Sequence, residues 1–120
     1  MYTLIIKDAF SSAHFLNGHD GKCRELHGHT WKIEIRVVHD QLDRIGMVAD
    51  FSYLKRELTA LINDLDHRCL NDLVVFKTTN PTSENIAQYI FDEYMKKVAP
   101  LRVSQVRVWE SDSASVIYRP

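Results

Sequence analysis

The run His27–His39 constrains the fold more than any other segment, because its residues alternate between two classes with a period of two. One class contains His27, His29, Trp31, Ile33, Ile35 and Val37, and the other contains Thr30, Lys32, Glu34 and Arg36. Successive side chains of a β-strand point to opposite faces of the sheet, so the pattern predicts one long strand with one buried face. The histidines at the start of this strand would lie on its buried face.

Three other segments have the alternation or the β-branched composition of strands. They are residues 2–7, extending to about residue 15, residues 103–110, and residues 114–118. The short Ser-Asp-Ser segment between the last two suits a hairpin loop. The Gly-, Asn- and Asp-containing residues 16–26 are expected to form a loop, and residues 40–46 a turn.

Two helices are expected between the second and the third strand. Ser52 can cap a helix that runs to about Leu65, and a second helix starts at Asn80-Pro81-Thr82 and ends before Pro100. Residues 66–79 between them are expected to be mostly irregular. The order strand, strand, helix, helix, strand, strand predicts an α+β fold, with an antiparallel four-stranded sheet and two helices on one face.

Length and composition indicate a single domain over residues 1–120, large enough to bury a hydrophobic core. The net charge of −1 gives no broad basic surface for nucleic acid or for an anionic membrane. We find no apolar run that could span a bilayer and no signal sequence, so we expect a cytoplasmic protein. With only Cys23 and Cys69, the chain has no disulfide framework.

The strongest chemical signal is His27-Gly28-His29. Residues two apart on a strand project to the same side, roughly 7 Å apart, so their imidazoles can converge on one ion. His14 lies near the end of the preceding strand, which would pair with this one and supply a third nitrogen. Three neutral histidines are the ligand set of catalytic zinc, which keeps a fourth position open. For each histidine alone, the alternative is an ordinary hydrogen-bonded residue.

Cys23 has three possible roles. Lys22 and Arg24 flank it, and neighbouring cations and a nearby metal ion lower the pKa of a thiol. A thiolate could act as a general base beside a zinc-bound substrate, or it could itself be a zinc ligand. The third possibility is an inert thiol in a loop. Cys69 follows the end of a predicted helix, and we interpret it as a packing residue.

Two further sites contain acidic groups. At Asp66-His67, the favoured explanation is structural: the C-terminus of the preceding helix stabilises His67 as a cation. The alternative is that His67 carries a proton and that the Asp66 carboxylate orients it. Glu110 has the parity of Val106 and Val108, so it ends an inward-facing row. It could bind the amide-bearing edge of a ligand, or it could be the first exposed residue after a strand. His19 and His39 are interpreted as surface residues.

Several motifs together resemble the 6-pyruvoyl-tetrahydropterin synthase family, and most closely its bacterial 6-carboxy-tetrahydropterin synthase branch. They are Ser12-Ala13-His14, Cys23-Arg24-Glu25-Leu26-His27-Gly28-His29, Leu65-Asp66-His67, Asn80-Pro81-Thr82-Ser83-Glu84-Asn85 and Trp109-Glu110. The resemblance covers nearly the whole chain. The short gap between Cys23 and His27 is similar to that of the 6-carboxy branch.

The resemblance implies the tunnelling fold, whose unit has the order of strands and helices given above. By resemblance, the zinc ligands are His14, His27 and His29, the catalytic base is Cys23, the acid/base relay is Asp66 with His67, and the residues at the pterin are Glu110, Thr82 and Ser83. It also implies a homo-oligomer, a hexamer built from two trimers, with pterin pockets between subunits.

The implied reaction converts 7,8-dihydroneopterin triphosphate into 6-carboxy-tetrahydropterin, acetaldehyde and triphosphate with Zn²⁺ as cofactor, a step toward queuosine and related deazapurines. Three alternatives remain open. One is formation of 6-pyruvoyl-tetrahydropterin from the same substrate. Another is an enzyme of this fold that acts on dephosphorylated dihydroneopterin in folate synthesis. The third is a zinc- or pterin-binding module without catalytic activity.

Overall fold

The computed structural model describes residues 1–120 and contains one antiparallel sheet, in which the strands lie in the order β1-β2-β3-β4. Their bounds are β1 Tyr2–His14, β2 His27–His39, β3 Arg102–Ser111 and β4 Ala114–Tyr118. β1 and β2 pair along their whole length, from Tyr2 opposite His39 to His14 opposite His27. The predicted antiparallel sheet is therefore confirmed, and β2 has the predicted bounds.

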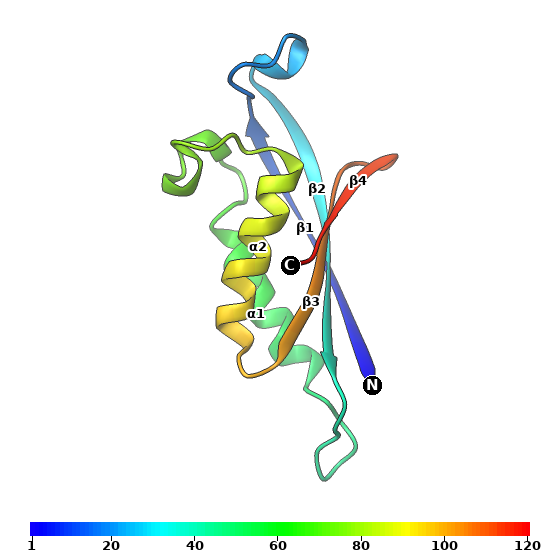
Figure 1. Ribbon diagram of the computed structural model, residues 1–120. Coiled ribbons are helices and arrows are strands. Elements are labelled where there is room, and N and C mark those ends of the chain that lie inside the picture. Colours follow the sequence, from blue (N-terminus) through cyan, green and yellow to red (C-terminus); the bar gives the residue numbers. More distant parts are fainter.

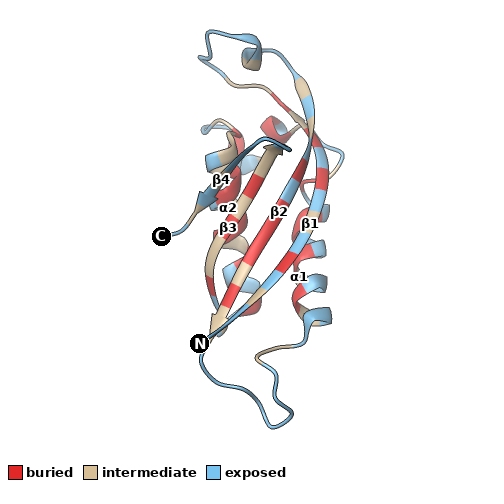
Figure 2. Ribbon diagram, turned by 90° about the vertical axis from the view of Figure 1, so that its right-hand side faces the viewer, coloured by how far each residue is buried: buried red, intermediate tan, exposed pale blue.

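Both helices cover the same face of the sheet, as Figure 1 shows. They are α1 (Phe51–Asn63) and α2 (Ser83–Val98), so the predicted α+β order is confirmed. Their apolar stripes pack against the alternating apolar residues of the strands, which Figure 2 shows as buried bands on β1, β2 and β3. Each buried Leu or Ile side chain stabilises this layer by about 1.5–3 kcal/mol relative to full exposure.

The helix caps agree with the sequence in one case and differ in the other. Thr82 caps α2 as predicted, because its side chain accepts a hydrogen bond from the backbone N–H of Asn85 at 3.1 Å. The prediction that Ser52 caps α1 is wrong. The cap is Asp50, whose carboxylate accepts from the backbone N–H of Ser52 at 2.7 Å, and a negative charge there also complements the helix dipole.

Glu34 departs from the predicted alternation. It belongs to the class of β2 residues expected on the exposed face, yet only 6% of the residue is accessible. Its carboxylate lies 2.9 Å from Arg36 Nε and 3.7 Å from Lys7 Nζ. The long stems of these cations cover the carboxylate while their charges compensate for its burial.

The connections place two loops that matter for the candidate site. The loop between β1 and β2 contains a short 3₁₀ helix, Lys22–Arg24, at one end of a molecule 54 Å long (Figure 1). The segment between α1 and α2 contains two more 3₁₀ helices, Leu70–Asp72 and Val74–Phe76, within otherwise irregular backbone. Neither α1 nor α2 has the length and apolar character that crossing a membrane requires.

Candidate metal centre

The pairing of β1 with β2 brings three histidines together at one end of the sheet. His14 is opposite His27 in the register, and Ser12 is opposite His29. The ring centroids of His14 and His27 are 4.5 Å apart, those of His14 and His29 are 5.2 Å apart, and those of His27 and His29 are 4.8 Å apart. The histidines that the sequence predicted to converge therefore do so.

Backbone carbonyl groups orient two of these rings. His14 Nδ1 donates to the carbonyl of Pro81 at 2.7 Å, and His27 Nδ1 donates to the carbonyl of Glu25 at 2.7 Å. In a neutral imidazole, a protonated Nδ1 leaves the lone pair on Nε2. The fully buried Trp31 packs edge-on against His14, with centroids 4.9 Å apart, and so closes the inner side of the cluster.

The unsatisfied nitrogen atoms of the cluster fit a metal ion. His14 Nε2 and His29 Nε2 are buried and have no hydrogen-bond partner. Leaving such a group unpaired costs about 1–3 kcal/mol, so a ligand for both is expected. One potential ligand atom from each of His14, His27, His29 and Glu110 lies within 4.8 Å of all the others. A cation held between these atoms would satisfy the buried nitrogens.

Burial favours the neutral imidazole that metal binding requires. It lowers the pKa of His14, and the neighbouring His27 and His29 lower it further, against an opposing effect of the hydrogen bond to Pro81. Burial also lowers the pKa of His29, while the negative charge of Glu110 opposes that shift. Both rings are thus poorer bases toward protons than free histidine.

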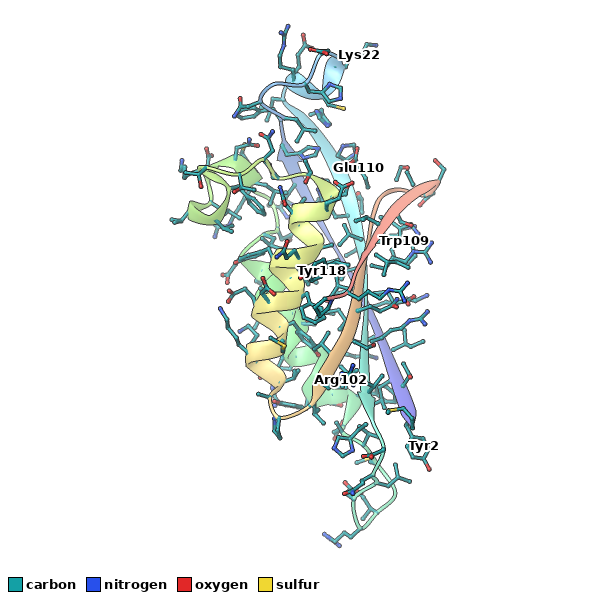
Figure 3. The ribbon with its side chains drawn as sticks, in the orientation of Figure 1. Tyr2, Lys22, Arg102, Trp109, Glu110 and Tyr118 are labelled. Carbon is teal, nitrogen blue, oxygen red and sulfur yellow. The ribbon has the colours of Figure 1, made fainter.

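Figure 3 shows Glu110 beside the start of α2. Its Oε1 is 3.4 Å from His29 Nε2, and its Oε2 accepts a hydrogen bond from the Ser83 hydroxyl at 2.8 Å. Ser83 is the first residue of α2, so the start of this helix positions the carboxylate. The Thr82 hydroxyl accepts the capping hydrogen bond from Asn85, which leaves its own proton available as a donor.

Cys23 lies in the loop between β1 and β2, within the 3₁₀ helix that begins at Lys22, which Figure 3 labels. Its residue is half-buried, and its sulfur is not among the atoms that converge as potential metal ligands. Lys22 and Arg24 on either side have no carboxylate within ion-pair distance.

Asp66 and His67 lie against the outer edge of β1. Asp66 Oδ1 accepts from the backbone N–H of Ser11 at 2.9 Å, and Asp66 Oδ2 is 2.8 Å from His67 Nδ1. The Ser11 N–H, and then the His67 side chain, lower the pKa of Asp66 below its ordinary value. The His67 side chain is 82% exposed, and no hydrogen bond joins it to Cys23 of the same chain.

The helix-end explanation of His67 is wrong. Helix α1 ends at Asn63 with Asp64 as its cap, and His67 instead occupies a turn with φ of 54°. A left-handed conformation is uncommon for a residue with a side chain, and it persists where the surroundings hold it. Here the backbone N–H of His67 donates to the carbonyl of Ser11. The turn therefore presents an exposed imidazole whose Nδ1 is oriented by a carboxylate.

Sequence reasoning did not find three contacts of this centre. The Pro81 and Glu25 carbonyls orient histidines through backbone atoms. Every residue has a backbone carbonyl, so the residue type does not indicate these contacts. The hydrogen bond from Ser83 to Glu110 joins segments far apart in the chain. The parity of Glu110 with Val106 and Val108 was the available signal, and it predicted the correct face.

Comparisons with known proteins agree with this geometry. The sequence model of the family described as 6-pyruvoyl tetrahydropterin synthase matches residues 3–120. The chain is 38% identical to a 6-carboxy-5,6,7,8-tetrahydropterin synthase of Synechocystis, over 98% of this chain and 93% of the relative. It is 32% identical to a dihydroneopterin monophosphate aldolase of Pyrococcus furiosus, over 94% of this chain and 93% of the relative.

The fold also matches a solved structure. The structure of Caenorhabditis elegans 6-pyruvoyl tetrahydropterin synthase superposes with a TM-score of 0.89 at 30% identity, covering 99% of this chain and 95% of that chain. The predicted tunnelling fold is thereby confirmed.

Proposed function

This chain belongs to the 6-pyruvoyl tetrahydropterin synthase family, and we propose on that basis that it converts 7,8-dihydroneopterin triphosphate into 6-carboxy-5,6,7,8-tetrahydropterin, acetaldehyde and triphosphate. It would be a zinc-dependent lyase on the route to queuosine and related 7-deazapurines. The identity to a 6-carboxy enzyme over nearly the full length supports this choice of reaction. The short spacing between Cys23 and His27 supports it as well.

The observation that carries the proposal is the convergence of three imidazoles with buried, unpartnered Nε2 atoms on His14 and His29. We assign zinc to this centre because three neutral histidines are its usual catalytic ligand set, and we assign Glu110, the fourth converging group, to the substrate. When bound there, zinc supplies a Lewis acid that polarises the side-chain oxygens of the pterin and stabilises the negative charge left by proton removal.

We assign the removal of the carbon-bound proton to Cys23. Lys22 and Arg24 flank it in the short 3₁₀ helix, and neither forms an ion pair with a carboxylate. The thiol is absent from the converging ligand atoms, which supports a base over a metal ligand. In this proposal, the half-buried thiol on the loop that joins β1 and β2 faces a substrate held beside the histidines.

His67 is assigned to proton transfer on the hydroxyl groups of the substrate side chain. Its Nδ1 donates to Asp66, so in the neutral ring Nε2 is free to accept a proton. Asp66 is in turn fixed by the backbone N–H of Ser11, so the pair is oriented before substrate arrives. The exposure of His67 leaves it accessible to a substrate outside its own chain.

Glu110 is assigned to the amino-pyrimidine edge of the pterin, with Thr82 and Ser83 lining the pocket. A carboxylate can accept two parallel hydrogen bonds from the donor pair on that edge. Ser83 occupies one oxygen of Glu110, which favours a fixed orientation of the carboxylate. The proximity of Glu110 to His29 also leaves a second role open, beside the reacting end of the substrate.

We further propose that the protein assembles into a hexamer of two trimers, in which each site is shared between chains. The open sheet has two edges, at β1 and β4, and closing sheets from several chains into a barrel removes such edges. In this arrangement Cys23 and the metal centre of one chain face Asp66 and His67 of its neighbour. The exposed His67 side chain is consistent with that role.

The test of the proposed reaction is identification of its products. Purified metal-loaded protein is incubated with 7,8-dihydroneopterin triphosphate, and the products are separated by chromatography. We expect 6-carboxy-tetrahydropterin, acetaldehyde and triphosphate, with a His29→Ala variant as the inactive control. Release of triphosphate without acetaldehyde, together with 6-pyruvoyl-tetrahydropterin, would replace the proposal by the pyruvoyl-forming reaction. If the metal-loaded protein shows no turnover, the remaining explanation is a zinc- or pterin-binding module without catalytic activity.

One observation favours a second candidate function. The likeness to a dihydroneopterin monophosphate aldolase extends over most of both chains. An aldolase of that kind would cleave a pterin that carries fewer phosphates. Parallel incubations with dihydroneopterin, its monophosphate and its triphosphate separate the two candidates by their kcat/KM values.

A further inference from the structure

A donor-rich hollow lies next to the Asp66-His67 turn. It has a volume of 570 Å³ and is formed by the ends of β1 and β2 and by residues 67–69. Arg68, His67 and Thr30 line it, and it extends to His29 of the metal centre. Its volume is within the range of known ligand sites. The hollow therefore opens beside the predicted proton carrier, on the face of the sheet opposite to the converging histidine nitrogens.

The floor of the hollow consists of small residues. Ala13 on β1 is directly opposite Gly28 on β2 in the register. A Cβ added at Gly28 would meet no atom closer than the Ser12 carbonyl oxygen at 4.0 Å, so the space above the glycine is open. Gly28 thus keeps the surface behind the two histidines accessible to a ligand.

The chemistry of the lining favours an anion. Arg68 supplies a guanidinium, and Ser11 and Thr30 supply hydroxyl groups, while no aspartate or glutamate lines the hollow. The nearest carboxylate in the sequence, Asp66, has its two oxygens engaged by the Ser11 N–H and by His67. Arg68 itself has no carboxylate within ion-pair distance. Its five N–H donors are therefore free for phosphate oxygens.

We propose that this hollow binds the triphosphate group of the substrate and that Arg68 is its principal binding residue. The inference rests on the proposed function, which supplies a substrate with one strongly anionic end. The carboxylate of Glu110 lies at the opposite, α2-facing side of the histidines, where it would repel a polyphosphate. With the metal centre supplied by a neighbouring chain, as proposed above, the substrate would place its phosphates toward Arg68 and its pterin away from it, toward that centre.

The position of Arg68 links phosphate binding to proton transfer. It follows His67 directly, and its backbone carbonyl accepts a hydrogen bond from Ala13 at 2.9 Å, which fixes the turn against β1. A triphosphate held by Arg68 therefore lies beside the imidazole of His67, whichever chain supplies the metal centre. Lys22 and Arg24, which flank Cys23, would add positive charge from the other side of the substrate.

The test measures binding of inorganic triphosphate by calorimetry to metal-loaded protein. Metal content is measured before and after the titration, because triphosphate chelates divalent ions. We expect Arg68→Gln to raise the Kd at least about tenfold, and Arg68→Lys to recover part of the affinity. Thr30→Val should raise the Kd by a smaller factor. The matched control is Arg44→Gln, an exposed arginine in the turn at the other end of the sheet, which should leave the Kd unchanged.

Kinetics separate phosphate binding from a general effect on the site. In Arg68→Gln, the KM for dihydroneopterin triphosphate should rise, while the Kd for unphosphorylated dihydroneopterin stays at the wild-type value. An unchanged Kd for inorganic triphosphate in a folded Arg68→Gln protein would overturn the inference. Failure of the wild type to produce acetaldehyde would instead overturn the proposed function. The two failures are therefore distinguishable.

Discussion

His14 and His29 meet edge to face, with ring centroids 5.2 Å apart, and both rings have a buried Nε2 without a hydrogen-bond partner. Two such nitrogens destabilise a hydrophobic core, because each loses its hydrogen bond to water and forms no other hydrogen bond in the protein. Their arrangement is explained by a ligand that both can bind, and a metal ion is the smallest ligand that satisfies both at once.

The first prediction is a content of about one zinc per chain. His27→Ala or His29→Ala should lose the metal and the activity, while the fold persists because the helices and the sheet supply the core. Metal analysis, activity and circular dichroism measure the three quantities. Native protein that repeatedly contains no zinc, and that gains nothing when zinc is added, would contradict the assignment.

The second prediction concerns Cys23. Cys23→Ala should retain zinc and pterin binding but lower kcat by about 10²–10⁴-fold, because a general base acts on the barrier and not on ground-state affinity. Loss of zinc from Cys23→Ala would instead make the thiol a ligand and would favour the non-catalytic module.

The third prediction concerns Glu110. Glu110→Gln should raise the Kd for the pterin by about ten- to a hundredfold, since hydrogen bonds to a charged group contribute about 1.5–3 kcal/mol. Ser83→Ala should have a smaller effect in the same direction, because it frees the carboxylate that Ser83 holds. A Kd that does not change, with kcat alone reduced, would move Glu110 from the pterin edge to the reacting end beside His29.

The strands and the apolar stripes of the helices were predictable because apolar residues recur along them with the spacing of a strand or of a helix. β2 has the predicted bounds, since both of its faces are marked by the alternation. Glu34 breaks that alternation because Arg36 and Lys7 fold over it, which a pattern of single residues does not contain. The cap of α1 was mistaken because Asp50 and Ser52 are both good capping residues, and the position of Phe51 within the helix decides between them.

The convergence of the histidines was predictable for the same reason, since strand geometry places side chains two apart on one side. The setting of Asp66-His67 was not. Backbone–backbone bonds to Ser11 and Ala13 hold this turn against β1, and such bonds do not depend on side-chain type. The hollow beside Arg68 arises from that docking, so only the structure reveals it.

The fourth prediction follows from the pKa of Asp66, which the Ser11 N–H and then His67 lower from 3.8. A carboxyl group whose pKa is lower in the folded state stabilises the fold above its unfolded pKa, and this contribution is lost as the pH falls through the folded pKa. Asp66→Asn should therefore unfold at lower urea concentration than the wild type at neutral pH, with the difference shrinking below pH 3.8. A difference independent of pH would mean that the charge of Asp66 does not contribute.

The fifth prediction is that Cys23 and His67 act on one substrate from different chains. The His67 side chain is 82% exposed and forms no hydrogen bond with Cys23 of its own chain, which fits a site completed by a neighbour. Inactive Cys23→Ala and inactive His67→Ala proteins are denatured together and refolded. Mixed oligomers should recover part of the activity, because some interfaces then pair an intact Cys23 with an intact His67. Each variant refolded alone is the control. Complete inactivity in a mixture shown by mass spectrometry to contain hetero-oligomers would place both residues of a working site in one chain.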